Sequence, residues 1–455
     1  MPLRLKLRMA PAIIAANSRN KWQRSEIEAY QKVRLKKLTN FARRRSAFYR
    51  DVLPSDPSTP LAGLPVLTKA TFHDEWDSIV TSRVLRRDKV LGWLGRHQPL
   101  GRSYLGMYRV MATSGSTGAR TPFAYSRSEW AQIMTTVARL AYWRGGMSAR
   151  GERLVSILNT AESSSAGAPI SYLIGHSLRR LTKGGSILDQ SMPIDELVVE
   201  LNRIQPDTIS SFASTLTLLA EAQLRGDLKL SLKHVHSSSE VLSLEAALLI
   251  ERAFGCRPHN AHAMTECGVL AASCDHGTGM HLLDDMTIVE CVDDNYNPVP
   301  TGALASRVLI TNLWARTLPL IRYEITDRLR LSEYGCSCDR PFPVIESIEG
   351  RTADIVRLPG QSCAEVSVRA WEVQRALFGR GILLWQIRWS TTQIILRVVH
   401  DKKTDMGDLQ TVFRNALDRL DVDGKIPVKV HIEDEITAGA TGKVKRFVRI
   451  EGETN

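Results

Sequence analysis

The sequence predicts an α/β protein with a large N-terminal domain of mixed sheets and helices and a small, mobile α+β domain at the C-terminus. Short runs of β-forming residues alternate with longer helical stretches up to about residue 345. The same alternation restarts on a smaller scale after Gly350. A chain of 455 residues is also too long for one ordinary domain. We therefore expect an N-terminal domain over residues 1–350 and a C-terminal domain over residues 351–455.

The N-terminal part begins with an expected amphipathic helix. Apolar residues recur at helical spacing between residues 25 and 50, among many basic side chains. A turn-rich connector, Leu61–Lys69, follows this helix. Further along, the pattern predicts three strands and one helix: the strands are Arg153–Leu158, Lys233–His236 and Ser306–Leu313, and the helix is Leu242–Phe254.

The C-terminal part has the pattern of a compact α+β module. A small domain on a large one is common in enzymes that close over a substrate, which is why we expect it to be mobile. The predicted elements, in order, are a helix over Ser367–Phe378, strands over Ile382–Trp389 and Gln393–His400, a helix over Leu409–Leu420 and a strand over Pro427–Ile432.

Composition and charge exclude several classes of protein. No apolar run approaches the roughly 18 residues of a membrane-spanning helix. The short apolar segment Met9–Asn17 has no convincing cleavage site, so we expect a cytoplasmic protein. The first 50 residues hold fourteen Lys or Arg and only two acids, whereas the rest of the chain is neutral, which argues against nucleic-acid binding by the body. The basic segment suits an acidic carrier protein or an anionic membrane surface, or it is simply a solvated helix.

A Ser/Thr/Gly-rich segment is the most specific local motif. It reads Thr113-Ser114-Gly115-Ser116-Thr117-Gly118. Its glycines allow backbone N–H groups to point toward one place and its hydroxyls add donors, so it is suited to holding a polyphosphate. It is neither a Walker loop nor a nucleophile elbow. Taken alone, it is equally compatible with an ordinary surface loop.

Four more motifs follow along the chain. Asp327 stands at the end of a strand-like run, where a carboxylate can hold the two hydroxyls of a ribose. The Thr265-Glu266 pair would by itself be interpreted as a helix cap. The motifs are Asn260–Gly268, Thr311–Asp327, Gly350–Asp354 and Thr441–Arg446.

In this order and spacing, the five motifs resemble the adenylate-forming superfamily of acyl-CoA synthetases and adenylation domains, and above all its phenylacetate–CoA ligase-like branch. The resemblance extends from about Arg43 to Arg446. It implies that the 113–118 loop holds the β- and γ-phosphates of ATP. It implies that Glu266 binds Mg²⁺ and that Thr265 lies near the α-phosphate.

The resemblance also implies the remaining roles. Asp327, assisted by Arg351, would bind the ribose, and His262 would stack on adenine. Lys443 would bridge the carboxylate and the α-phosphate, with Lys445 as the alternative. The acid pocket would be lined from segments that contain Ser211, Ser214 and Ser239, although each of these is equally compatible with an ordinary loop.

The implied reaction is ATP-dependent activation of a carboxylic acid, aromatic or short acyl, to an acyl-adenylate with release of pyrophosphate. Transfer to CoA or to the phosphopantetheine thiol of an acyl carrier protein would follow. The chain departs from the family at His262-Ala263, where an aromatic residue and glycine are usual, and at Ala353, where the family has its hinge acid. Two alternatives therefore remain: an adenylate-forming enzyme with a non-thiol acceptor, and an inactive nucleotide-binding protein.

The cysteines suggest a metal site. Cys274 and His281, together with Cys336-Ser337-Cys338, offer three thiolates and an imidazole, which is a ligand set for tetrahedral Zn²⁺. Some relatives in this branch carry a similar set. His276 is an alternative fourth ligand, and free cysteines in a reducing compartment are the alternative to a metal. A closed site of this kind would be structural.

Overall fold

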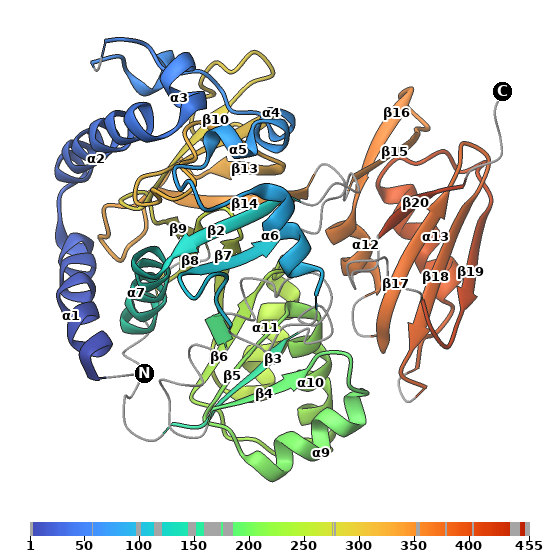
Figure 1. Ribbon diagram of the computed structural model, residues 1–455. Coiled ribbons are helices and arrows are strands. Elements are labelled where there is room, and N and C mark those ends of the chain that lie inside the picture. The colour runs from blue at the N-terminus through green and yellow to red at the C-terminus, as the bar shows by residue number, and fades with distance from the viewer. Residues whose placement is uncertain are drawn as a thin grey trace.

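A long mixed sheet is the centre of the fold. The computed structural model describes residues 3–56, 58–96, 102–112, 121–143, 152–158, 174–175, 185–274, 276, 279–351, 355–377, 380–402, 405–436 and 446–450. Within these residues the sheet has nine strands in the order β13-β14-β9-β8-β7-β6-β5-β3-β4. Figure 1 shows helices on both sides of it and a separate, smaller body that begins at β15.

One half of this sheet is parallel. Its strands are β3 (Leu154–Leu158), β4 (Ser186–Asp189), β5 (Thr208–Ser211), β6 (His234–Ser238) and β7 (His259–Met264). Apolar side chains of these strands pack against α9 (Ile194–Ile204), α10 (Ala213–Arg225) and α11 (Leu244–Phe254). The carboxyl ends of parallel strands meet at one edge, which is where α/β proteins place their ligand sites.

The other half is antiparallel and lies over the largest core. It consists of β8 (Gly268–Ser273), β9 (Met280–Leu282), β13 (Asp327–Leu331) and β14 (Val344–Arg351). A hairpin and a second sheet supply more of that core. The hairpin is β1 (Tyr108–Ala112) with β2 (Pro122–Ser126), and the second sheet is β10 (Thr287–Val292), β11 (Arg307–Asn312) and β12 (Tyr323–Ile325). Helices α4 (Lys69–Asp74), α5 (Trp76–Ile79), α6 (Arg87–Leu94) and α7 (Arg127–Trp143) complete it.

The basic N-terminal segment runs as helices along the outer side of the large domain (Figure 1). These are α1 (Leu3–Ser18), η1 (Arg19–Lys21), α2 (Arg24–Arg45) and α3 (Ala47–Val52), followed by η2 (Leu61–Gly63). The single helix expected over residues 25–50 is therefore two helices, because it is interrupted at Ser46. The side chain of Ser46 accepts a hydrogen bond from the N–H of Tyr49, so it caps α3 and divides the helix. Among the described residues, no helix is long and apolar enough to cross a membrane.

The smaller body has its own core, which includes residues from Val356 to Ile426. Its strands are β15 (Ile355–Pro359), β16 (Glu365–Arg369), β17 (Ile382–Trp389), β18 (Ile394–His400), β19 (Val428–Ile432) and β20 (Phe447–Arg449), and its helices are α12 (Ala370–Leu377) and α13 (Leu409–Arg419). The helix expected from Ser367 is wrong at its start. Residues 367–369 belong to β16, because the alternation in Glu365–Arg369 lets this segment pair with β15.

Candidate functional site

The Thr265-Glu266 pair lies in the tight turn between β7 and β8. Gly268 closes the turn with a φ of +79°, which favours glycine, and a Cβ there would lie 3.3 Å from Ile133. Two side chains hold the turn by its carbonyls. The Tyr125 hydroxyl donates to the Thr265 oxygen at 2.5 Å, and Asn312 Nδ2 donates to the Glu266 oxygen at 3.2 Å. Neither bond occupies the Glu266 carboxylate itself.

Two tyrosine hydroxyls and a cysteine thiol next to this turn stay protonated. Burial raises the pKa of the Tyr125 hydroxyl and of the Cys267 thiol well above their usual values, and the nearby Glu266 raises both further. Burial and Glu266 have the same effect on the pKa of Tyr323. The pKa shifts of these three groups therefore place the Glu266 carboxylate close to Tyr125, Cys267 and Tyr323.

His262 and Asp327 come together from β7 and β13. The His262 Nε2 atom lies 3.9 Å from Asp327 Oδ1, and both side chains are largely buried. Asp327 pairs in register with Arg351 across β13 and β14, so the backbones of these two predicted ribose-binding residues are adjacent. An imidazole and a carboxylate at the edge of a sheet can bind a planar base and a pair of hydroxyls.

Several predicted residues fall outside the described part of the chain. These are Thr113, Ser114, Gly115, Ser116, Thr117 and Gly118 of the loop, Lys443 and its alternative Lys445, and Ala353. Their immediate neighbours are described. Tyr125, which anchors the Thr265 turn, lies on the strand that follows the loop. Arg446 donates to the Trp385 carbonyl at 2.9 Å and fixes the end of the C-terminal motif on β17.

The three serines proposed for the acid pocket differ in their surroundings. Ser211 is buried and donates to the Ile157 carbonyl at 3.1 Å, so its hydroxyl is used within the sheet. Ser239 is exposed and has a φ of +70°. Ser214 begins α10 and lines a cavity of about 20 Å³ that also includes Trp385 and Arg446 of the smaller domain. Ser214 is therefore the one that lies beside the C-terminal motif.

A hydrogen-bonded chain that sequence reasoning missed ends at Thr121. His73 of α4 contacts the Thr121 hydroxyl through Nδ1 at 3.0 Å, and its Nε2 contacts the Arg87 guanidinium. The same guanidinium also lies 3.1 Å from Nδ1, so Arg87 and Thr121 both contact this ring nitrogen. Thr121 lies three residues after the predicted phosphate loop. The residues are far apart in sequence, and no motif signals them.

The four predicted zinc ligands form one cluster. The ligand atoms of Cys274, His281, Cys336 and Cys338 all lie within 4.8 Å of one another. Cys274 Sγ lies 3.5 Å from Cys336 Sγ, and Cys338 Sγ lies 3.2 Å from His281 Nε2. His281 Nδ1 is 3.1 Å from the Phe342 carbonyl, which orients the ring with Nε2 toward the sulfurs.

The donor set fits Zn²⁺. The cysteines are free rather than disulfide-bonded, and the pKa of Cys336 is raised by burial and by the neighbouring thiols. Crowded thiols of this kind lose their protons together only when a cation compensates the charge. The alternative ligand, His276, is exposed and does not belong to the cluster.

Comparison with known proteins gives a sequence relative. No family model matches the chain. The chain is 26% identical over 375 residues to a phenylacetate–coenzyme A ligase of Thermus thermophilus, which covers 76% of this chain and 75% of the relative. This similarity confirms the resemblance expected from the motifs.

Comparison with solved structures gives the fold. A 2-hydroxyisobutyryl-CoA ligase in its postadenylation state matches with a TM-score of 0.72 at 19% identity, over 95% of this chain and 91% of that one. The same enzyme in its thioesterification state matches with a TM-score of 0.59 at 20% identity, over the same shares of the two chains. The expected fold is confirmed.

Proposed function

We propose that this chain, an acid–thiol ligase of the adenylate-forming fold, uses ATP and Mg²⁺ to convert a carboxylic acid, aromatic or short acyl, to an acyl-adenylate and transfers the acyl group to CoA. One observation supports this most directly. The strand that follows the predicted phosphate loop is hydrogen-bonded, through Tyr125, to the turn that carries Glu266. This bond supports placing the predicted phosphate loop and the predicted cation ligand in one site.

The chemistry requires positive charge. A carboxylate that attacks ATP approaches a polyanion, so cations and oriented donors supply most of the catalysis. Mg²⁺ on Glu266 would neutralise phosphate charge. Asp327 and His262 would hold the adenosine, and Lys443 would lie between the acid and the α-phosphate.

ATP–pyrophosphate exchange with a panel of aromatic, hydroxyaromatic and short aliphatic acids tests the proposal. We expect exchange that depends on one acid and falls by about a hundredfold in Glu266→Gln and in Lys443→Ala. Lys445→Ala is the matched control and should keep exchange. Nucleotide binding without exchange for any acid would instead favour an inactive homologue.

The acceptor is tested separately. After exchange is established, thioester formation is measured with CoA and with a phosphopantetheinylated carrier protein. CoA thioester supports the proposal. Pyrophosphate release without a thioester from either acceptor would favour a non-thiol acceptor, the alternative suggested by Ala353.

We also propose that Cys274, His281, Cys336 and Cys338 hold a structural Zn²⁺. The ion would join the end of β8 to the segment between β13 and β14. Strand β8 follows the turn that carries Glu266, and β13 begins with Asp327. Its contribution would be to folding rather than to the reaction, since four protein ligands leave no open position.

A further inference from the structure

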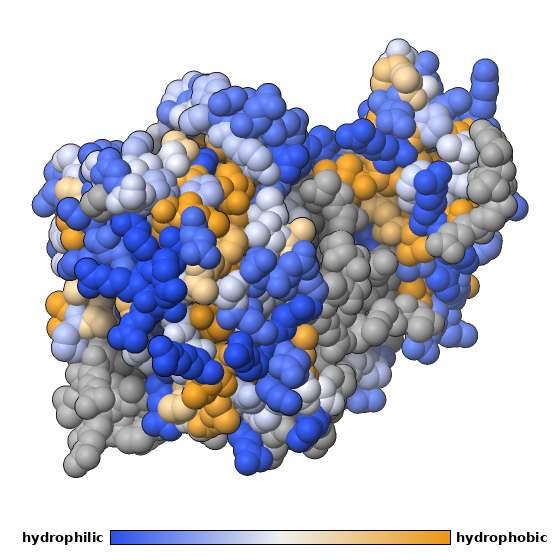
Figure 2. All heavy atoms as spheres, turned by 45° about the horizontal axis from the view of Figure 1, so that its top comes forward, coloured by the Kyte–Doolittle hydropathy of each residue, from blue (hydrophilic) through white to orange (hydrophobic). Residues whose placement is uncertain are grey.

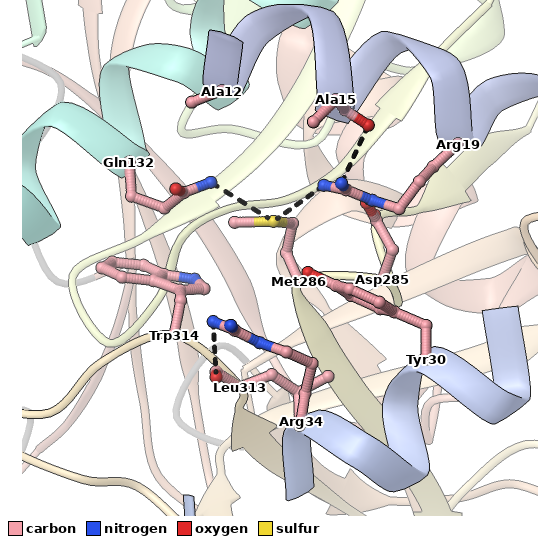
Figure 3. A pocket seen from close by; sticks show the side chains of 10 residues that line it. All are labelled: Ala12, Ala15, Arg19, Tyr30, Arg34, Gln132, Asp285, Met286, Leu313 and Trp314. Carbon is pink, nitrogen blue, oxygen red and sulfur yellow. Dashed lines mark hydrogen bonds and ion pairs between the residues drawn. The ribbon is translucent and has the colours of Figure 1, made fainter. Parts of the chain in front are cut away.

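A cavity of about 180 Å³ lies where the N-terminal helices pack against the rest of the large domain. Its walls come from the N-terminal helices on one side and from the body of the large domain on the other. Figure 3 shows Arg19, Tyr30 and Arg34 on the helical side and Gln132, Met286 and Trp314 facing them. A cavity needs only about 10–15 Å³ of such space to hold one water molecule, so this one has room for a small organic molecule.

The cavity has an excess of positive charge. Arg19 binds Asp285 at 2.6 Å, but Asp285 also binds Arg139 at 2.9 Å, so one carboxylate serves two guanidinium groups. Arg34 donates to the Leu313 carbonyl at 3.4 Å, and no acidic side chain among the described residues pairs with it. Arg19 and Arg34 lie 5.0 and 5.9 Å from the centre of the same Tyr30 ring. An anion is the ligand that this charge favours.

The walls favour a flat anion. Tyr30 and Trp314 present aromatic rings, and a guanidinium binds a carboxylate through two parallel hydrogen bonds. Arg34 stands between these rings, with its guanidinium directed toward Trp314 (Figure 3). A carboxylate on a small aromatic body would satisfy the donors of Arg34 and pack its ring against the apolar wall.

Trp314 connects the cavity to the catalytic turn. Its ring stacks on Tyr125 with centroids 5.6 Å apart, and Tyr125 donates to Thr265. Its backbone N–H donates to Asn312 Oδ1 at 3.3 Å, and Asn312 also holds the Glu266 carbonyl. Tyr125 and Asn312, which anchor the turn, therefore both contact Trp314. A molecule in the cavity would also contact Trp314.

We propose that this cavity is an effector site for a small aromatic carboxylate, whose binding against Trp314 shifts the turn that carries Glu266. The effect on catalysis rests on the proposed function, whereas binding does not. The site is distinct from the predicted acid pocket, because its residues come from α1, η1, α2, α7 and the segments around residues 285 and 314.

Binding is measured by fluorine NMR with para-fluorobenzoate as the probe. Ala12→Phe fills the cavity and Arg34→Gln removes its cation. Ile14→Phe, at a position 69% exposed on the same helix as Ala12, and Arg44→Gln, exposed on the same helix as Arg34, are the matched controls. We expect affinity to fall by about tenfold or more in the first pair and to stay within about twofold in the controls.

Equal affinity of wild type, Ala12→Phe and Arg34→Gln would overturn the proposal, as would displacement of the probe by inorganic phosphate at equal concentration. Thermal melting of each variant shows that it is folded. A second readout tests the effector role: the probe should change the rate of pyrophosphate exchange in wild type but not in Ala12→Phe. An identical effect in both proteins would contradict the effector role. Asp327→Asn should be impaired in exchange and should still bind the probe, which separates binding from the proposed function.

Discussion

At the scale of single residues, the predicted nucleotide site is supported by side chains to which no motif gave that role. Tyr125 and Asn312 hold the carbonyls of the turn that carries Glu266, and His73, which Arg87 contacts, lies against Thr121. They come from four separate segments. Such residues are visible only after folding, because a hydrogen bond between distant segments leaves no periodic signal in the sequence.

Thr121→Val tests the chain of hydrogen bonds that ends beside the phosphate loop. The substitution keeps the shape of the side chain and removes the hydroxyl that contacts His73. We expect the KM for ATP to rise by about tenfold while kcat changes little, because one donor near the phosphates is lost. Thr135→Val, which removes a buried hydroxyl on α7 that donates to the Ala131 carbonyl, is the control. A similar KM change in both variants would contradict this role.

Asp284 gives a pH-dependent contribution to stability. Burial raises its pKa from 3.8 to about 6, although Arg24 opposes the shift. The folded state therefore holds a proton that the unfolded state has released, and stability falls as pH rises from about 4 to about 6. The difference is at most about 3 kcal/mol.

We expect Asp284→Asn to lose this component, so its free energy of unfolding should change less between pH 4 and pH 7 than that of wild type. Urea unfolding at several pH values measures it. Asp51→Asn, at an exposed position on α3, is the control and should follow the wild-type profile. Parallel profiles for wild type and Asp284→Asn would show that the carboxyl is already charged in the folded state at low pH.

At the scale of elements, the Cys/His cluster joins segments that the sheet alone holds loosely. The pairing of β9 with β14 comprises only two residue pairs, Val344 with His281 and Ile345 with Met280. A zinc ion held by the cluster would add a crosslink at that point. Asp327 and Arg351 lie on the neighbouring strands, so the metal would support the nucleotide site indirectly.

We expect purified protein to contain one zinc per chain, and Cys336→Ser and Cys338→Ser to lose it and to melt at lower temperature. Elemental analysis and thermal melting measure the two effects. Cys363→Ser is the matched control, because Cys363 is exposed in the smaller domain and should change neither quantity. Zinc-free protein with wild-type stability would rule out a structural metal.

At the scale of the whole molecule, the basic N-terminal helices form one side of the large domain. Figure 2 shows strongly hydrophilic side chains gathered on the left of this face, the side on which α2 lies in Figure 1. Some of the basic residues are structural: Arg43 donates to the carbonyls of Pro54 and Ser55, and Arg24 pairs with Asp284. Arg44 and Arg45 are exposed and suited to an acidic partner.

Charge reversal of Arg44 and Arg45 tests a carrier protein as acceptor. If the acyl group is delivered to an acidic carrier, Arg44→Glu with Arg45→Glu should slow carrier loading by about tenfold and leave adenylation unchanged, because steering acts on association. Loading at several salt concentrations measures it. The reversal of Lys229 and Lys233 on the opposite part of the domain is the control, and equal loss in both variants would exclude a specific surface.

The sequence by itself determined the fold class, several of the helices and strands, and the five motifs. Strand and helix periodicity is local, so Ile382–Trp389, Leu409–Arg419 and Leu244–Phe254 follow from the pattern within a few residues. The motifs also predicted roles for Asp327 and Glu266, and the spacing of cysteine and histidine predicted the four residues of the cluster. It erred at Ser46 and at residues 367–369, where a cap and a strand partner override helical spacing.

Only the tertiary structure decided which side chains meet. It placed Tyr125 on the Thr265 turn, brought Cys274 and Cys336 to 3.5 Å from each other, and built a cationic cavity from Arg34 and Trp314. These contacts join segments separated by 62 to 280 residues along the chain. Distances across a fold are set by how elements pack, and no local pattern encodes them.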